Sequence, residues 1–217
     1  MTQRLIDISP KLGIHSPVYP GDPVFSVQRA ASVAMGDPAE VSAVTFSLHT
    51  GAHVDAPSHL YPGTGDAADL PLERFIGPVL VIDLTELEPE AAPTDLIGPQ
   101  VLAAVKAMNG RLLPRVLFKT RLKQPEGWSS DFRALAPETV ECLAAEGVEL
   151  VGIDAPSIDP AESMELFAHR AALGRGMSVM ENLDLTDAAA GEYELIALPL
   201  PLVGVEASPV RAVLRAI

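Results

Sequence analysis

One stretch of fourteen residues, 46–59, constrains this chain more than any other part of it. It reads FSLHTGAHVDAPSH and holds three of the five histidines, with Asp55 between the second and the third. Gly51 and Pro57 disfavour a helix here, because glycine costs backbone entropy and proline removes a hydrogen-bond donor. The residues upstream alternate between apolar and polar, which predicts a half-buried strand over 41–49 that passes into an extended loop.

The three histidines and the aspartate have the composition of a metal site. Residues two apart in an extended chain share a side, so His49, His53 and Asp55 are expected to point the same way. Gly51 between them would leave clearance for a metal ion or a substrate. Imidazole nitrogens and carboxylate oxygens are ordinary ligands of zinc and similar metals, and a catalytic site keeps a position open for water. The alternative is that these histidines lie in a surface loop or form structural hydrogen bonds.

Length and composition predict one globular domain over residues 1–217, with a full hydrophobic core. Hydrophobic residues make up 48% of the chain and charged residues 20%, as in folded soluble proteins. The formal net charge of −14 and the absence of a basic run argue against a nucleic-acid or membrane partner. The one cysteine, Cys142, excludes an internal disulfide and is expected to be buried. With no signal peptide visible in residues 1–7 and no membrane-spanning apolar stretch, we expect a cytoplasmic protein.

Apolar patterns elsewhere in the chain predict alternating strands and helices. Strands are expected at 5–8, 24–31, 78–84, 115–121, 148–154, 193–200 and 210–217, and helices at 99–108, 137–147 and 161–174. The continuous apolar runs indicate strands covered on both faces, whereas hairpin-like ends argue against a purely doubly wound fold. The sequence therefore predicts an α/β domain with a mixed sheet and packed helices.

Three further residues are candidates for the same site. Tyr19 lies between turn-forming prolines in the loop 16–23, where it either walls a pocket or packs on the surface. His169 lies in the predicted helix 161–174, where an ordinary structural role is the alternative. Glu181 is flanked by apolar residues and is either an exposed strand end or a buried carboxylate, which would need an ion or a hydrogen-bonding partner.

If His169 and Glu181 fold back onto the histidine stretch, the ligands suffice for two divalent metal ions. Asp55, Glu181 or both would then bridge the ions. The excess positive charge would lower the pKa of a bound water and favour a hydroxide nucleophile at neutral pH. The expected chemistry is hydrolysis of an amide, an ester or a lactam. His59 is left as a free imidazole that can carry protons between the reacting groups.

Residues 49–59, HTGAHVDAPSH, resemble the His-Thr-Gly-Thr-His-x-Asp-x-Pro-x-His signature of the cyclase-like metal hydrolases. Within that family the chain resembles the kynurenine formamidase (arylformamidase) branch nearly end to end. The segments that carry this second resemblance include DIS at 7–9, YPGD at 19–22, RVL at 115–117, DAPS at 154–157, ENL at 181–183 and YELIALPL at 193–200.

The resemblance implies an enzyme that hydrolyses N-formyl-L-kynurenine to L-kynurenine and formate in tryptophan degradation. It implies a swivelling β/β/α-type fold, a homodimer or larger homo-oligomer, and two zinc ions per subunit, although manganese or cadmium suits the same ligands. It assigns the proton donor and acceptor to His59. The metal ligands that it implies are His49, His53, Asp55, His169 and Glu181.

Two positions depart from the family pattern. Tyr19 stands where the formamidases usually have a tryptophan that stacks on the aromatic ring of the substrate; tyrosine can also stack, with a smaller area. Ala52 replaces the commoner threonine and removes a hydroxyl group near the site. The difference at Tyr19 leaves an alternative activity, hydrolysis of another small aromatic or cyclic amide such as isatin, because a few pocket contacts can reset substrate choice.

Overall fold

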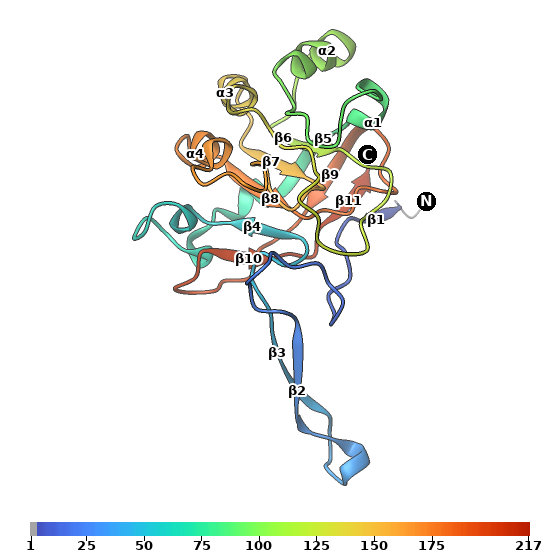
Figure 1. Ribbon diagram of the computed structural model, residues 1–217, viewed down its shortest axis with the longest axis vertical. Coiled ribbons are helices and arrows are strands. Elements are labelled where there is room, and N and C mark those ends of the chain that lie inside the picture. The colour runs from blue at the N-terminus through green and yellow to red at the C-terminus, as the bar shows by residue number, and fades with distance from the viewer. Residues whose placement is uncertain (1–3) are drawn as a thin grey trace.

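A nine-stranded mixed sheet organises the computed structural model, which describes residues 4–217 (Figure 1). The strand order across the sheet is β1-β11-β9-β5-β6-β7-β8-β4-β10. The strands are β1 (Leu5–Asp7), β4 (His53–Asp55), β5 (Ile76–Asp83), β6 (Arg115–Lys119), β7 (Leu150–Ile153), β8 (Ser178–Glu181), β9 (Gly191–Ile196), β10 (Ala207–Pro209) and β11 (Val213–Ala216). The helices are α1 (Leu84–Leu87), α2 (Gln100–Asn109), α3 (Pro137–Ala145) and α4 (Phe167–Leu173). Residues 1–3 lie outside the described residues; they belong to the segment 1–7 in which the sequence shows no signal peptide.

The sheet is parallel in its centre and antiparallel at both sides. Strands β5 to β8 pair in parallel, and helices α2, α3 and α4 lie between them in the chain. The helices gather on one side of the sheet in Figure 1. Strands β9, β11 and β1 on one side, and β4 and β10 on the other, pair antiparallel. The prediction of an α/β fold with a mixed sheet is confirmed.

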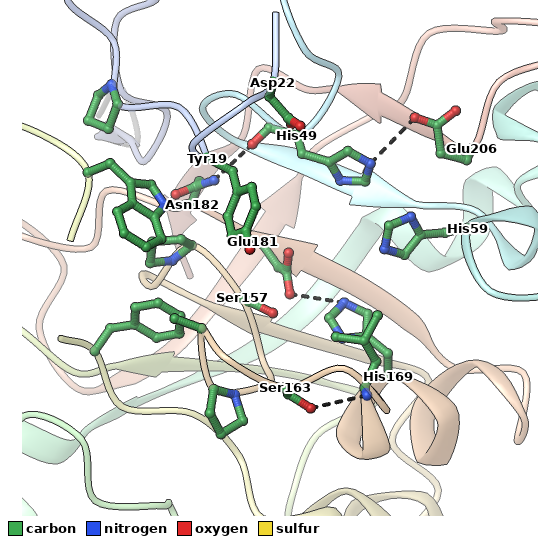
Figure 2. Close-up of a pocket in the computed structure, with 17 residues that line it drawn as sticks. Tyr19, Asp22, His49, His59, Ser157, Ser163, His169, Glu181, Asn182 and Glu206 are labelled. Atoms are coloured by element: carbon green, nitrogen blue, oxygen red, sulfur yellow. Dashed lines mark hydrogen bonds and ion pairs between the residues drawn. The ribbon is translucent and has the colours of Figure 1, made fainter. Parts of the chain in front are cut away.

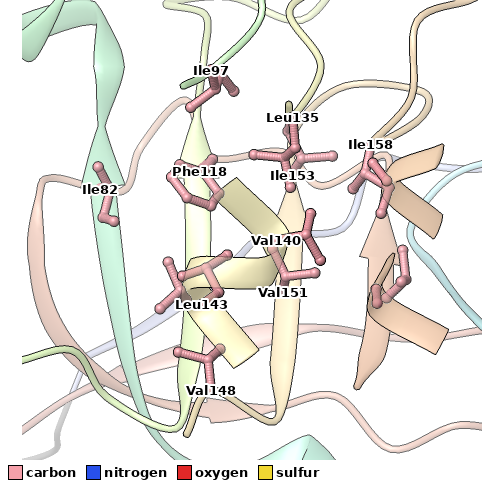
Figure 3. Packing of buried hydrophobic residues seen from close by; sticks show 14 of the residues in the cluster. Ile82, Ile97, Phe118, Leu135, Val140, Leu143, Val148, Val151, Ile153 and Ile158 are labelled. Atoms are coloured by element: carbon pink, nitrogen blue, oxygen red, sulfur yellow. The ribbon is translucent and has the colours of Figure 1, made fainter. Parts of the chain in front are cut away.

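Each face of the sheet has its own hydrophobic core. On the helix side, Val140 and Leu143 of α3 lie over Phe118 of β6 and Val151 of β7 (Figure 3). On the opposite face, side chains of the central strands pack against side chains of the outer strands. The sheet must curl around this second core to bring them together. This second core includes Leu117, Leu150, Val54, Leu195 and Leu214. Because the central strands are covered on both faces, their sequences are continuously apolar, as predicted.

Strands β2 (Ser26–Ala31) and β3 (Val41–Thr45) form a separate hairpin that projects from the body as an arm (Figure 1). Every residue of β3 is exposed. The predicted half-buried strand over 41–49 is therefore wrong in two respects, since neither face of β3 is buried and the strand ends at Thr45.

The strand ends there because the next residues are held in a turn. Thr50 N donates to Ser47 O, and Ser47 Oγ donates to Asp22 Oδ2 at 2.7 Å. The second bond joins the base of the arm to the Pro-rich loop 16–23. The histidine stretch consequently begins in a turn, not in a strand.

Two further expectations need correction. The predicted helix 161–174 begins only at Phe167, because Leu166 has a left-handed φ of 49° and the preceding residues form turns. Cys142 is exposed, not buried, because the inward stripe of α3 runs through Thr139, Val140 and Leu143. Among residues 4–217, no helix has the length and apolarity needed to cross a bilayer.

Candidate metal centre and substrate pocket

Two neighbouring antiparallel strands carry the centre of the candidate site. Strand β4 contributes His53 and Asp55, and β8 ends in Glu181, which is paired directly with His53. All three side chains are buried. The sequence predicts an extended loop where the short strand β4 lies, and the extended backbone agrees with this prediction. The sequence does not predict that β4 pairs with a strand on each of its edges.

The other candidates approach this strand pair from three different segments. His49 lies in the turn before β4, and His59 lies in the short 3₁₀ helix Pro57–His59 that follows β4. His169 comes from α4 and is buried. The fold therefore brings together all six residues predicted to bind metal or transfer protons. Two of them, His169 and Glu181, lie more than a hundred positions after the histidine stretch in the sequence.

Gly51 does not provide clearance for a metal ion or a substrate. Its φ is +69°, a left-handed conformation that favours glycine, and a Cβ atom at this position would lie 2.4 Å from Leu12 Cδ2. The space beside Gly51 is occupied by the Leu12 side chain. The glycine is needed for the turn and for this close packing.

The ligand atoms of His49, His53, Asp55, His169 and Glu181 converge to within 3.5 Å of a neighbour, and those of His59 lie within 4.8 Å of His49 and Asp55. His53 Nε2 lies 3.1 Å from His49 Nδ1 and 3.4 Å from Glu181 Oε2. His169 Nε2 lies 3.2 Å from Asp55 Oδ2 and 3.1 Å from Glu181 Oε1. Two ligand triads, each with its ligand atoms within 4.8 Å of one another, share Asp55: His49 with Asp55 and His59, and His53 with Asp55 and Glu181.

One carboxylate oxygen in the cluster is left unsatisfied. Asp55 Oδ1 is buried and has no hydrogen-bond partner among the described residues; it lies 3.3 Å from His49 Nδ1 and 3.5 Å from His53 Nε2. Buried polar atoms are normally paired, and an exception calls for an explanation such as the binding of an ion. An anionic oxygen that faces two imidazole nitrogens fits the donor set of a first-row metal.

The protein keeps the carboxylates of this cluster ionised. Burial alone would raise the pKa of Asp55, but the hydrogen bond from His169 and the charges of His53 and His49 hold it well below its usual value. Burial likewise opposes the shift at Glu181, yet the charge of His169 lowers its pKa to about 2. Both groups are thus negative at neutral pH, which is the state that binds a cation.

The pKa values of two histidines of the cluster shift in opposite directions. Burial alone would lower the pKa of His49, but the attraction of Asp55, whose Oδ1 lies 3.3 Å from His49 Nδ1, and of the other nearby carboxylates raises it to about 9. The pKa of His59 falls below 6.5, because burial outweighs the attraction of Asp55. His59 is therefore neutral at pH 7 and able to accept a proton.

Asp159 fixes the orientation of His169. Its Oδ2 lies 2.7 Å from His169 Nδ1, and its two oxygens also accept the backbone N–H groups of Ala168 and His169 at 2.9 Å. With Nδ1 engaged, Nε2 of His169 faces Asp55 and Glu181. A carboxylate behind a histidine in this way sets its tautomer and raises its basicity as a ligand.

The cluster lies on one side of a cavity of about 480 Å³. His49, His59 and His169 gather at that side, whereas Tyr19 and Asn182 lie toward the other (Figure 2). Asn182 has a left-handed φ of 56°, and its side chain donates to His49 O at 3.0 Å. The volume is in the range of small-molecule sites.

Tyr19 lines this cavity, so the structure places it at the pocket wall. Its ring stands edge-on to Trp128, with 5.6 Å between the ring centroids. Phe132 also lines the cavity. The pocket therefore combines an aromatic wall with a cluster of histidines and carboxylates.

Sequence reasoning missed Trp128 and Asp159. Trp128 is the one tryptophan of the chain and follows a Pro- and Gly-containing loop after a strand, a combination that marks it as a candidate. Asp159 lies in the loop after β7, and its partner His169 is ten residues away. Glu206, 3.5 Å from His49 Nε2, also carried no recognisable local signal.

Comparisons with known proteins show the family to which the chain belongs. The family model described as "Putative cyclase" matches residues 6–160. The kynurenine formamidase of Delftia acidovorans is 46% identical over 218 residues, covering 100% of both chains. That of Bordetella pertussis is 48% identical over 214 residues, covering 98% of both. The chain belongs to the cyclase family.

Solved structures show the same architecture. A potential metal-dependent hydrolase with cyclase activity superposes with a TM-score of 0.82 at 27% identity, covering 100% of this chain and 99% of the other. Isatin hydrolase A from Labrenzia aggregata superposes with a TM-score of 0.84 at 24% identity, covering 98% and 93%. The second likeness is one of fold alone.

Proposed function

We propose that the protein hydrolyses N-formyl-L-kynurenine to L-kynurenine and formate. The observation that carries the proposal is the buried cluster of histidines and carboxylates, with its unpaired Asp55 oxygen, beside an aromatic-walled pocket. Relatives named kynurenine formamidase at 46% and 48% identity support this substrate. The whole chain, 1–217, would act as one hydrolase domain in the cytoplasm.

We propose two zinc ions as the cofactor, although manganese or cadmium suits the same oxygen and nitrogen ligands. Asp55 would be shared between the two ions, since it belongs to both triads of possible ligands. When bound, the metal would polarise the formyl carbonyl and lower the pKa of a water molecule. The residues proposed to hold the metal are His49, His53, Asp55, His169 and Glu181.

His59 would move the protons of the reaction. Its ring centroid lies 4.6 Å from that of His49 and 5.7 Å from that of His169, at the edge of the cluster. Because its pKa is lowered, the neutral imidazole can take a proton from the attacking water. The same nitrogen would then give that proton to the amide nitrogen of the substrate as the C–N bond breaks, releasing the aryl amine and formate.

Tyr19 would bind the aromatic ring of the substrate. It stands in the pocket with its ring against Trp128, so the two aromatic side chains form one surface. Aromatic pairs prefer offset or edge-to-face contacts, which this surface allows. Trp128 thereby compensates in part for the smaller ring at position 19.

A rate comparison tests the proposed function. Purified protein supplied with zinc should release formate from N-formyl-L-kynurenine much faster than it opens the ring of isatin. Removal of the metal with a chelator should abolish the activity, and zinc should restore it. Faster turnover of isatin would favour the alternative activity, and no turnover of either substrate at full metal occupancy would refute the assignment.

A further inference from the structure

A second cavity adjoins the substrate pocket. It has a volume of about 190 Å³ and shares four lining residues with the larger cavity. The shared residues are Pro17, Trp128, Pro156 and Asn182. Trp128 and Asn182 thus lie where the two cavities adjoin, between the cluster of histidines and this side pocket.

The side pocket differs from the main pocket in its charge. Lys11 and Arg121 both line it, whereas the main pocket carries the carboxylates of Asp22, Glu181 and Glu206. In a chain with a formal net charge of −14, two cations in one small cavity are notable. They favour a negatively charged ligand group.

Arg121 has unused hydrogen-bonding capacity. Its side chain is 18% exposed, and within residues 4–217 its nearest charged partner is Asp154, at 4.0 Å. The Asp154 oxygens already accept hydrogen bonds from Thr120 N, Thr120 Oγ1 and Arg121 N. A guanidinium group has five N–H donors, and its fork matches a carboxylate in a bidentate pair. Arg121 is therefore available for a ligand.

A carboxylate of the protein completes the charge pattern. Asp131 lines the same side pocket and is exposed. An α-amino acid carries one carboxylate and one ammonium group on the same carbon. The side pocket offers cations for the first and an anion for the second.

We propose that the side pocket binds the zwitterionic amino-acid end of the substrate. Arg121 and Lys11 receive its carboxylate, and Asp131 receives its ammonium group. The aromatic ring then lies along Trp128, and the formamide reaches the histidine cluster. This inference rests on the proposed function, because it assumes an aryl formamide that also carries an amino-acid chain.

The two cavities would therefore have different roles. The main pocket performs the chemistry, which any aryl formamide can undergo, while the side pocket selects substrates with an amino-acid chain. Interactions made equally in the ground and transition states change KM and leave kcat unaltered. The selection should therefore appear in KM.

The test compares two substrates in the zinc-loaded enzyme. One is N-formyl-L-kynurenine, and the other is 2-formamidoacetophenone, which keeps the ring and formamide but lacks the amino-acid chain. We expect Arg121→Gln to raise KM for the first by about 10- to 100-fold, the effect of losing a charged hydrogen-bonding pair. Its kcat for the first, and both constants for the second, should stay within about twofold of the wild-type values.

Two other variants keep the test decisive. Lys11→Gln alters an exposed residue and should raise KM for the amino-acid substrate in the same direction even if Arg121→Gln folds poorly. Lys123→Gln removes an exposed positive charge from the same loop, outside the cavity, and should change neither KM.

Equal effects on both substrates, or no effect of either pocket variant, would overturn the inference. Equal KM values for the two substrates in the wild-type enzyme would also overturn it and leave the formamidase chemistry intact. Failure of the wild-type enzyme on both substrates would instead count against the proposed function itself.

Discussion

Asp55 is the residue on which the candidate centre depends most. It is fully buried, it is ionised, and its two oxygens face three imidazoles from a turn, a strand and a helix. Two of these imidazoles, those of His49 and His53, approach Oδ1, but neither forms a hydrogen bond with it, and no other described residue does. A metal ion would replace the protons that otherwise hold such a cluster together. Metal binding and the local fold should therefore be coupled.

His59 is the residue whose role separates proton transfer from metal binding. We expect His59→Ala to lower kcat by about 10²- to 10⁴-fold, the usual contribution of a general acid and base. The variant should retain the zinc content of the wild-type protein, because five other ligands remain. Formate release and zinc per chain, measured on the same preparation, check both expectations.

The control is His15→Ala, which removes an exposed histidine outside the cavity and should leave kcat unchanged. The contrary result is also informative, because His59 lies within 4.8 Å of ligand atoms of His49 and Asp55. Loss of zinc in His59→Ala would show that His59 is a ligand, and normal turnover would exclude it from the chemistry.

The spacing of residues in the sequence could predict only part of this site. His49, His53, Asp55 and His59 were found because they lie within eleven positions. His169 and Glu181 were candidates whose proximity depends on how β8 pairs with β4, which no local pattern encodes. Asp159 and Trp128 were missed because each acts on a partner distant in sequence.

At the scale of elements, the carboxyl ends of β6 and β7 are joined by one buried carboxylate. Asp154 follows β7 and accepts hydrogen bonds from the backbone and the hydroxyl of Thr120, which follows β6. Asp154 N also donates to Phe118 O. The loops that leave these two strands carry Arg121 and Asp159, so the same carboxylate helps to position residues of both cavities.

Burial raises the pKa of Asp154 to about 6, against the lowering effect of the hydrogen bonds from Thr120. A raised pKa in the folded state means that the folded protein binds the proton more tightly. The stability that this provides is complete below pH 4 and is lost as the pH rises through 6. The shift from the usual value of 3.8 corresponds to about 3 kcal/mol.

We therefore expect Asp154→Asn to lose stability relative to the wild type at low pH and to regain part of it as the pH rises. The difference in unfolding free energy between the two proteins should change by about 3 kcal/mol between pH 4 and 7. Urea unfolding of the metal-free proteins across this range measures it. Asp187→Asn, which removes an exposed carboxylate, should show no such trend, and a flat difference for Asp154→Asn would contradict the argument.

Periodicity identified the central strands and helices because burial on two faces, or on one helical stripe, leaves a clear pattern. It failed at elements whose environment is set by other parts of the molecule. Strand β4 has three residues and is defined by its neighbours β8 and β10. Strand β3 alternates like a half-buried strand, yet nothing within the described chain covers either of its faces.

The arm is the feature of the whole molecule that the single chain does not explain. A two-stranded hairpin on its own is marginally stable in water. Val27 and Val44 form a cross-strand pair on it, and both are about half exposed. Contiguous exposed apolar surface is typical of protein-protein contacts, and this valine pair lies on an arm that projects from the body. We propose that a second copy of the chain covers the arm, in the homodimer or larger homo-oligomer that the family resemblance implies.

An introduced charge on the arm tests this assembly. The wild-type protein should have at least twice the monomer mass of 22.9 kDa in size-exclusion chromatography with light scattering. Val44→Asp should shift it toward the monomer, because a buried unpaired carboxylate opposes association. Val203→Asp places the same charge at an exposed valine outside the arm and should leave the mass unchanged. A monomeric wild type, or an intact oligomer in Val44→Asp, would show that the arm has another role.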